Sequence, residues 1–566
     1  MKRFSRTIAY ILLAALVFGL ASCEFQFTSI PTPPPTPTPT ETPIGIDPGA
    51  SNPEIVGDGK FTLRYNTKYD LNPITGTDRG NMIVSSLMYE GLFRLTPDLT
   101  AETVLCDSYE VNEDGTKWTF VLLDGVEMSD GTKLTAADAA FSINQAAGTV
   151  KLKTRLDCIQ GVSAIDTLKL QVNLKYANYG LPALLDFGLV KSNSTGPVPF
   201  GSGPYRLSAD KTHLQLMTDT RWRELNPSLP EAIYLTWCED NQYIEEFSEL
   251  RIDLMEVRGA EAKNTQIRRD HERANLVTND LMFIGINPSR AALDDERFRL
   301  VLSYASGRTR IADEIFGGYA LPAATPLNPD WKLYEKRWET VDDNDCIAKT
   351  SALFQDIGME DANEDLFLEY PYYGNYQPFS LTFIVNNSNT AEVAAAYIIT
   401  QNLINIGIDV RLEELTPSVF KTQLTEGNFH LYIATTKIPP DMNFLPLISE
   451  NGALNYGHLY SQSLADSQMD LFAANTTEEK QKAALYFCLD FDDYIPFVPL
   501  VYIRNEVKSG RNVISNVTIS PSGVFRYVGD WTFGSFGPAD SGNAEDEETE
   551  PTPPDTDGTA LPDGGE

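Results

Sequence analysis

The sequence lacks the local motifs that many enzymes and metal proteins carry. It has four histidines, with no HExxH pattern and no paired metal spacing, at His213, His271, His430 and His458. A GxSxG elbow, an SxxK with KTG, and a P-loop are also missing. We therefore expect no catalytic residue, no metal and no cofactor. Glycosidase chemistry by paired carboxylates needs no local motif. An enzyme therefore remains a third hypothesis, which assays for the hydrolysis of peptides or glycans would test.

Cysteine is scarce. Besides Cys23, the chain has five cysteines that are far apart and form no CxxC pair: Cys106, Cys158, Cys238, Cys346 and Cys488. A body of this size can bury a large core without disulfides, so we expect mostly buried free thiols and leave any pairing open.

Positive charge is also in short supply. The 566 residues include 44 Lys and Arg against 79 Asp and Glu, a formal charge of −35. Such a chain repels nucleic acid and anionic bilayer surfaces, whereas a cationic ligand is permitted. After the N-terminal segment, no apolar run reaches the length of a membrane span. These properties predict a globular, soluble body.

The N-terminus has the pattern of a secretory signal. Lys2, Arg3 and Arg6 precede an apolar run from 8 to 20, and Leu-Ala-Ser-Cys follows at 20–23. This resembles the bacterial lipobox, in which the cysteine is acylated. We expect a signal peptide at 1–22 and lipidation of Cys23; the alternative is an ordinary thiol in a cleaved signal.

Two further segments should not fold. Residues 23–55 include PTPPPTPTPTETP, which predicts an extended, solvated tether. Residues 538–566 contain ten acidic and no basic residues among Pro, Thr, Gly and Ser, which predicts a disordered tail.

The clearest local pattern lies between 109 and 145. Asp-Gly at 114–115 predicts a hairpin turn between strands at 109–111 and 117–122. Thr135, with Asp138 three residues later, predicts a helix start of the capping-box type. A helix is also expected at 81–89, and 417–426 should be a helix with proline first and Gly427 as its stop.

The run at 114–144, DGTKWTFVLLDGVEMSDGTKLTAADAAFSIN, resembles the signature of the family 5 extracellular solute-binding proteins. These are oligopeptide, dipeptide and nickel receptors of ABC importers. Leu123, Met128 and Ala139 depart from the family pattern, but the turns and the cap are intact. Further similar blocks follow in the family's order: YEGL at 89–92, GSGPY at 201–205, RLVLSYASGR at 299–308 and a helix, glycine and strand at 393–412.

The resemblance implies an α/β fold of the periplasmic-binding-protein type, the large type II form with an extra inserted domain. Its two lobes close on a ligand about a hinge. Transferred to this chain, lobe I covers 56–80, 200–283 and 497–537, the inserted domain 81–199, and lobe II 284–496. Such proteins are monomeric receptors that take a small molecule or peptide and meet an ABC permease in the membrane.

The resemblance also implies where the ligand is held. In peptide receptors, an edge strand of lobe II and its following loop bind the ligand's main chain, a case of β-augmentation. Here the strand is expected at 429–435, and 438–444 aligns with the family's YPDPxNF loop. The expected ligand-binding residues of this segment are Ala434, Thr435, Thr436, Lys437 and Asp441.

Lys437 stands where peptide receptors often carry an aspartate for the ligand's α-ammonium. Two ammonium groups repel in a dry site. Either the ligand is not held there by a free N-terminus, or Asp441 has taken that role; alternatively, Lys437 points to solvent at the rim.

Five further residues are expected at the ligand. Asn455 and Tyr456 lie in a loop that faces the cleft in the family, although a structural turn explains them equally well. Tyr65, Asn66 and Thr67 end the first strand at the rim of lobe I.

An aromatic cluster between 370 and 379 is either a stacking surface or a packed loop.

We therefore expect a lipid-anchored receptor on the outer side of the bacterial cell membrane or in the periplasm. It would capture a solute, a peptide above all, and deliver it to an ABC importer. The alternative is a surface peptide sensor or chaperone-like protein of the same fold without import. The sequence leaves open the ligand's identity and the Gram type.

Overall fold

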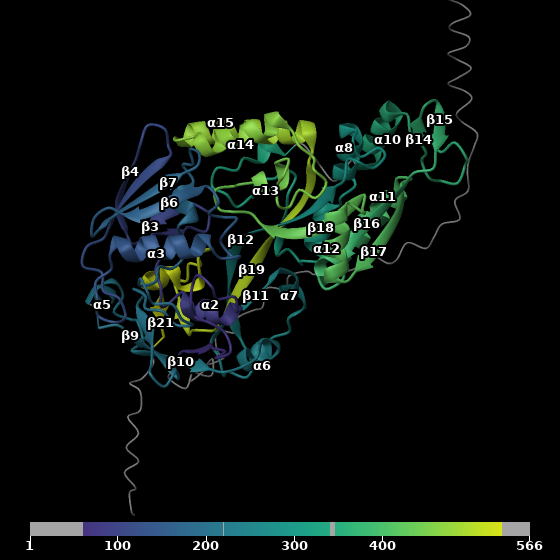
Figure 1. The fold of residues 1–566 in the computed structure, drawn as a ribbon. Helices are drawn as coiled ribbons and strands as arrows, with labels where there is room; N and C mark the ends of the chain where they lie inside the picture. Colours follow the sequence, from purple (N-terminus) through teal and green to yellow (C-terminus); the bar gives the residue numbers. More distant parts are fainter. Residues whose placement is uncertain (1–59, 219, 340–345, 535–566) are drawn as a thin grey trace, which may run out of the picture. The chain divides into compact units, whose positions relative to one another are not determined.

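Two long antiparallel strands, β12 (His271–Ile286) and β19 (Phe497–Gly510), connect the two halves of the fold (Figure 1). The computed structural model describes residues 60–218, 220–339 and 346–534. The register of β12 on β19 shifts between Val277 and Asp280. On one side of this shift β19 pairs with β11 (Leu254–Val257). On the other side of the shift, β12 pairs with β18 (Leu431–Lys437), and β19 pairs with β13 (Ala320–Pro322).

The first lobe contains two four-stranded sheets, ordered β1-β10-β9-β8 and β4-β5-β7-β6. Its elements are β1 (Thr62–Arg64), α2 (Arg79–Ser85), β2 (Phe93–Leu95), β3 (Ala101–Thr103), β4 (Cys106–Val111), β5 (Lys117–Leu122), α3 (Ala136–Ala147), β6 (Ile159–Ala164), β7 (Lys169–Leu174), α4 (Leu181–Leu184), β8 (Tyr205–Leu207), β9 (His213–Leu216), α5 (Thr220–Leu225), β10 (Ala232–Thr236), η1 (Asp240–Gln242), α6 (Tyr243–Ser248), α7 (Gly259–Asn264), β20 (Ile514–Ser515), η4 (Val524–Asp530) and β21 (Thr532–Phe533).

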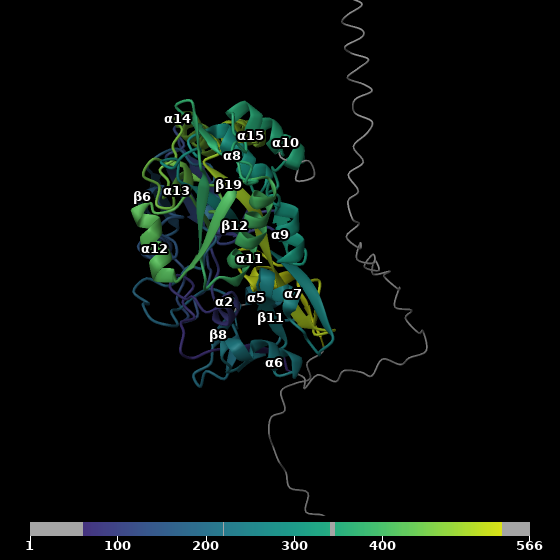
Figure 2. The same ribbon diagram turned by 90° about the vertical axis from the view of Figure 1, so that its right-hand side faces the viewer.

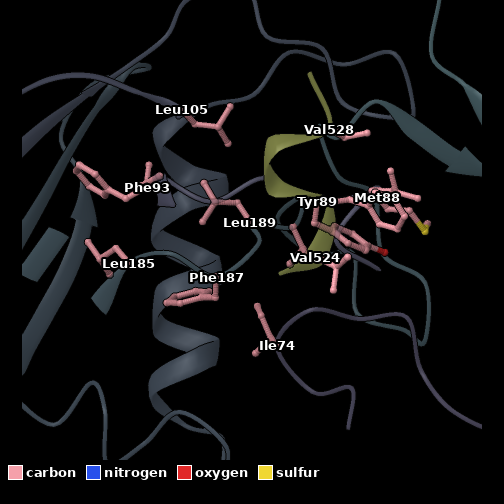
Figure 3. Packing of buried hydrophobic residues seen from close by; sticks show 14 of the residues in the cluster. Ile74, Met88, Tyr89, Phe93, Leu105, Leu185, Phe187, Leu189, Val524 and Val528 are labelled. Atoms are coloured by element: carbon pink, nitrogen blue, oxygen red, sulfur yellow. The ribbon is translucent and has the colours of Figure 1, made fainter. Parts of the chain in front are cut away.

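One hydrophobic core joins both of these sheets. It includes residues from the expected inserted domain, such as Phe93 and Leu189, together with Ile74 and with Val524 and Val528 of η4 (Figure 3). Burying these side chains against one another is the main favourable term that holds the segments together. The expected inserted domain therefore shares its core with the rest of the first lobe.

The second lobe is built on a sheet ordered β11-β19-β12-β18-β16-β17, with β13 beside β19. Its remaining elements are α8 (Glu296–Tyr304), α9 (Arg308–Glu314), η2 (Lys336–Trp338), α10 (Cys346–Ile357), β14 (Tyr370–Tyr372), β15 (Asn375–Gln377), β16 (Ser380–Asn386), α11 (Thr390–Asn405), β17 (Asp409–Leu415), α12 (Pro417–Glu426), α13 (Leu445–Ile448), α14 (Gln462–Ala473) and α15 (Thr477–Tyr494).

Both faces of this sheet are buried. Met282, Ile284 and Ile286 of β12 lie in one hydrophobic cluster, whereas Leu281 and Phe283 lie in another. This is the period-two alternation of a strand that is covered on both faces. Side chains of α8 to α11 line the first cluster and those of α12 to α15 the second, and Figure 2 shows α9 and α12 on opposite sides of the sheet.

Local chemistry explains several element boundaries. The capping box at Thr135 and Asp138 is present, so the predicted helix start is confirmed. Helix α12 begins at Pro417 and ends before Gly427, which has a φ of 68°, also as predicted. The helix predicted at 81–89 is present as α2, but it starts two residues earlier and ends four residues earlier. It starts at Arg79 because the Asp78 carboxylate caps it by accepting from Asn81 N.

The strand predicted at 429–435 lies two residues further on, as β18. Its antiparallel pairing with β12 places Lys437 opposite Asp280. The strand ends just before Pro439 and Pro440, which have no N–H for a sheet. In the part of the chain that the structure describes, no helix is long and apolar enough to cross a bilayer.

The predicted signal peptide, Cys23, the tether and the acidic tail lie outside the described residues.

Cys106, Cys158, Cys238 and Cys488 are buried free thiols, as expected. Burial raises the pKa of the Cys106 and Cys158 thiols to about 12.

Candidate functional site

The second half of β18 presents an unpaired backbone edge. On one side β18 pairs with β12 along its whole length, from Leu431 to Lys437. On the other side β16 pairs with it only at Leu431 and Tyr432. Among the described residues, no strand pairs with this edge from Ile433 to Lys437. Such an edge offers N–H and C=O groups to an extended chain.

The site residues expected on this strand lie along that edge. Ala434, Thr435 and Thr436 are half-buried, and Lys437 is exposed. Because side chains alternate across a strand, Ala434 and Thr436 share one face and Thr435 and Lys437 the other.

A buried carboxyl group, that of Glu392, lies beside the same edge. Glu392 belongs to the first turn of α11, where its N–H donates to Oδ1 of the N-cap residue Asn389 at 3.3 Å. The residue is 5% exposed. Burial raises its pKa to about 7, although the nearby hydroxyl and N–H of Thr435 oppose this rise. No ion pair to Glu392 occurs within the described residues.

Lys437 faces the first lobe. Burial lowers the pKa of Lys151 to about 8, and the Lys437 ammonium adds to this decrease. Burial raises the pKa of Glu256, and the Lys437 ammonium opposes that rise. Both Lys151 and Glu256 belong to the first lobe. The sequence left open whether Lys437 points to solvent at the rim; the residue is exposed, but on the side where the two lobes meet.

Asp441 joins the lobes. Its Oδ2 accepts from Asn178 Nδ2 of the first lobe at 2.9 Å. Burial raises the pKa of the Asp441 carboxyl to about 6, and the Asn178 hydrogen bond opposes that rise. In this structure the carboxyl is therefore engaged between the lobes.

The loop that carries Asn178 makes three more contacts with the second lobe. The rings of Tyr176 and Phe472 stack with centroids 5.5 Å apart. The N–H of Tyr179 donates to the Phe472 carbonyl at 2.8 Å, and Lys480 Nζ donates to the Tyr179 carbonyl at 3.3 Å. Together these contacts hold the lobes face to face next to the β18 edge.

The three expected residues of the first lobe differ in their surroundings. Tyr65 is buried, and burial raises its pKa. Asn66 is fully buried and holds the turn after β1: its N–H donates to Asn81 Oδ1 at 2.9 Å and its Nδ2 to Glu239 at 3.2 Å. Thr67 is exposed. Their contact with a ligand stays a prediction.

Asn455 and Tyr456 show the contacts of a structural turn. Asn455 Nδ2 donates to the carbonyls of Ser449 and Leu459, both at 2.8 Å. The ring of Tyr456 packs edge-on against Tyr432, with centroids 5.9 Å apart. A ligand contact for either residue also stays a prediction.

Sequence reasoning missed Glu392, Lys151 and Asn178. The spacing of Asn389 and Glu392 is a capping pattern, so it could have located a helix start, but not the neighbouring Thr435. Nothing local marks Lys151 or Asn178, because their partners lie far away in the chain.

Other chemistry is sparse in the described residues. They contain no group of three or more His, Cys, Asp or Glu side chains placed to hold a metal. Two cavities, of about 230 and 20 Å³, lie away from the β18 edge. The first is lined by residues of β12, β19 and the segment 514–517, and the second by residues such as Leu300 and Phe491.

Comparison with known proteins gives a family-level match. The model described as "Bacterial extracellular solute-binding proteins, family 5 Middle" matches residues 100–455. The glutathione-binding protein GsiB of Pectobacterium atrosepticum is 25% identical over 281 residues, which are 45% of this chain and 53% of that protein. The chain therefore spans about half the length of the curated relatives it matches.

Solved structures share the fold. The ABC transporter substrate-binding protein CtaP from Listeria monocytogenes superposes with a TM-score of 0.67 at 18% identity, over 84% of this chain and 99% of that one. The oligopeptide-binding protein AppA from Bacillus subtilis, solved with a nonapeptide, gives 0.59 at 17% identity over the same shares. The expected two-lobed α/β fold is thereby confirmed.

Proposed function

Because the chain belongs to the family 5 bacterial extracellular solute-binding proteins, we propose that it captures a peptide between its two lobes and delivers it to an ABC importer. The observation that carries this proposal is the unpaired edge of β18 from Ile433 to Lys437, which faces the first lobe. Main-chain bonding at such an edge gives affinity without demanding a particular sequence.

The strands β12 and β19 support a hinge. Both cross from one lobe to the other, and the register shift between Val277 and Asp280 interrupts their regular pairing. We propose that the hinge lies at this shift, a few residues before the expected boundary after residue 283. The expected division has lobe I at 56–80, 200–283 and 497–537, an inserted domain at 81–199 and lobe II at 284–496. Ligand that contacts both lobes would then favour the closed population.

Attachment to the membrane is part of the proposal. Cys23 would be acylated, and a monomer on the tether 23–55 would meet its permease at high effective concentration. Replacing Cys23 by Ser should move the protein from the membrane fraction to the soluble fraction after cell fractionation. Retention of the variant in the membrane fraction would contradict lipidation at this position.

The ligand class is tested by native mass spectrometry of the full chain, released from a mild detergent. We expect a co-purified mass that fragments as a peptide. Calorimetry should then give heat with synthetic peptides and none with sugars or metal chelates. Binding of a sugar or chelate alone would refute the peptide assignment while leaving the family intact.

A further inference from the structure

The β2–β3 hairpin of the first lobe contributes side chains to the cores of both lobes. Phe93, at the start of β2, belongs to the core cluster of the first lobe. Leu99 lies in the loop 96–100 at the tip of the hairpin, and it belongs to the cluster that side chains of α12 to α15 line. Among the described residues, all other members of that cluster lie at or after Val277. The hairpin tip is therefore part of the second lobe's core.

Leu99 has a backbone conformation that leucine rarely adopts. Its φ is 62°, in the left-handed region, and the residue is 3% exposed. Its N–H donates to the Thr96 carbonyl at 2.9 Å, and the Thr96 N–H donates to the Thr100 carbonyl at 2.8 Å, which closes the loop. Glycine or asparagine fits such a turn position with less strain. The burial of the leucine side chain in the other lobe offsets this strain.

The tip also bonds directly to the second lobe. The N–H of Lys332 donates to the Asp98 carbonyl at 3.0 Å. The Lys332 ammonium lies 3.9 Å from the Asp98 carboxylate, but both side chains are exposed, so this ion pair adds little stability. The backbone hydrogen bond and the buried Leu99 side chain are therefore the main parts of the contact.

The second-lobe segment 326–332, which contacts the tip, is attached at the proposed hinge. Asn328 Nδ2 donates to the Thr278 carbonyl at 2.9 Å, and Thr278 lies within the register shift of β12 on β19. The hydroxyl of Tyr502, on β19, donates to the Pro326 carbonyl at 2.6 Å. The hairpin tip thus contacts a segment that is bonded to both crossing strands.

We propose that the hairpin tip 96–100 is a latch that stabilises the closed arrangement of the two lobes. The inference rests on the lobe movement of the proposed function, and it adds a contact that involves none of the expected ligand-binding residues. Because Phe93 packs the hairpin in the first lobe, separation of the lobes must withdraw Leu99 and expose it to water. The latch then sets part of the balance between open and closed forms, which scales the apparent affinity for any ligand that binds the closed form.

Hydrogen–deuterium exchange of the full-length protein, resolved to single amides by mass spectrometry, tests the latch. Two N–H groups report on the lobe interface at separate places: that of Lys332 at the tip, and that of Tyr179, which donates to the Phe472 carbonyl. Opening of the lobes exposes both to exchange. Leu99→Gly relieves the backbone strain but removes the buried side chain, so we expect exchange about tenfold faster or more at both amides.

Three further variants are the controls. Leu99→Met keeps an apolar side chain and should exchange nearly as the wild type does. Leu99→Asn tolerates the left-handed conformation but is polar, so it should reproduce Leu99→Gly and gives a second substitution should that variant not fold. Leu250→Gly changes another leucine with a positive φ, 65°, which is 58% exposed, and should leave both amides unchanged. The Tyr234 N–H, bonded to the Phe61 carbonyl within the first lobe, is the internal reference.

Faster exchange at Lys332 alone would refute the latch, because the contact would then matter only locally at the tip. No change at either amide, or an equal change in Leu250→Gly, would also refute it.

The exchange measurement needs no ligand, so its result is separate from that of the proposed function. If synthetic peptides give no heat in calorimetry while both amides respond to Leu99→Gly, the latch stands and peptide capture is refuted. If peptides bind and neither amide responds, the latch is refuted and peptide capture stands.

Discussion

Glu392 should make the second lobe less stable as the pH rises. Its carboxyl is 5% exposed and burial raises its pKa from 4.5 to about 7. Between these two pH values the folded chain keeps a proton that the unfolded chain releases, so the free energy of unfolding falls with increasing pH. At about 1.4 kcal/mol per pKa unit, the loss approaches about 3 kcal/mol above pH 7.

The variant Glu392→Gln removes this titration but keeps an acceptor for Thr435. We expect wild type and variant to differ little near pH 4.5, and the variant to be more stable by about 3 kcal/mol at pH 8. Urea unfolding at pH 4.5, 6 and 8, followed by tryptophan fluorescence, measures the difference. Glu426→Gln, at an exposed position of α12, is the matched control.

Parallel pH profiles of wild type and Glu392→Gln would refute the reasoning. They would show that the carboxyl is solvated or paired with a cation in solution. If the variant's stability advantage over the wild type were larger at pH 4.5 than at pH 8, the predicted sign would be reversed.

Three further variants test other parts of the structure. Arg299, 1% exposed, donates hydrogen bonds to backbone carbonyls and lies 4.0 Å from the Glu296 carboxylate. Arg299→Met should lower the free energy of unfolding, measured with urea, by about 3 kcal/mol or more, because the carbonyl acceptors stay buried. Asn178→Ala removes the bond to Asp441 and should increase the radius of gyration of the ligand-free protein in X-ray scattering. Gly285→Ala would place a Cβ 2.0 Å from the Tyr432 ring and should lower the unfolding free energy by about 1–3 kcal/mol.

A control variant or a contradicting result can be named for each of the three. Arg297→Met changes an exposed neighbour of Arg299 and should leave stability nearly unchanged. Unaltered scattering of Asn178→Ala would show that this bond does not hold the lobes together. A fully stable Gly285→Ala would mean that Tyr432 can rotate away at no cost.

Local chemistry made part of this fold predictable. Caps and stops such as Thr135 and Gly427 act within one turn of the chain, so their effect is visible in the sequence. The start of β18 was displaced by two residues because its register is set by β12, about 150 residues away in the chain. Pairing between distant strands leaves no local signal at either of them.

The strand of the candidate site was predictable to within two residues, but the groups around it were not. Resemblance led to the strand that carries Thr435 and Lys437. The groups that face them, Glu392 and Lys151, come from a helix start and a loop whose own sequences explain only local structure. In the same way, Arg299 belongs to a recognisable motif, yet its role as a buried donor to carbonyls follows only from the fold.

The shared core of the first lobe also governs the order in which the chain can fold. The N–H of Phe525 donates to Ser86 Oγ across 439 positions of sequence, and the ring of Phe61 packs against that of Phe533. Both contacts need the last described residues of the chain. The second lobe draws most of its core from the continuous stretch between the two crossing strands. During synthesis it can therefore be complete first, while the segment made earliest waits for the C-terminal strands, the reverse of the usual vectorial order.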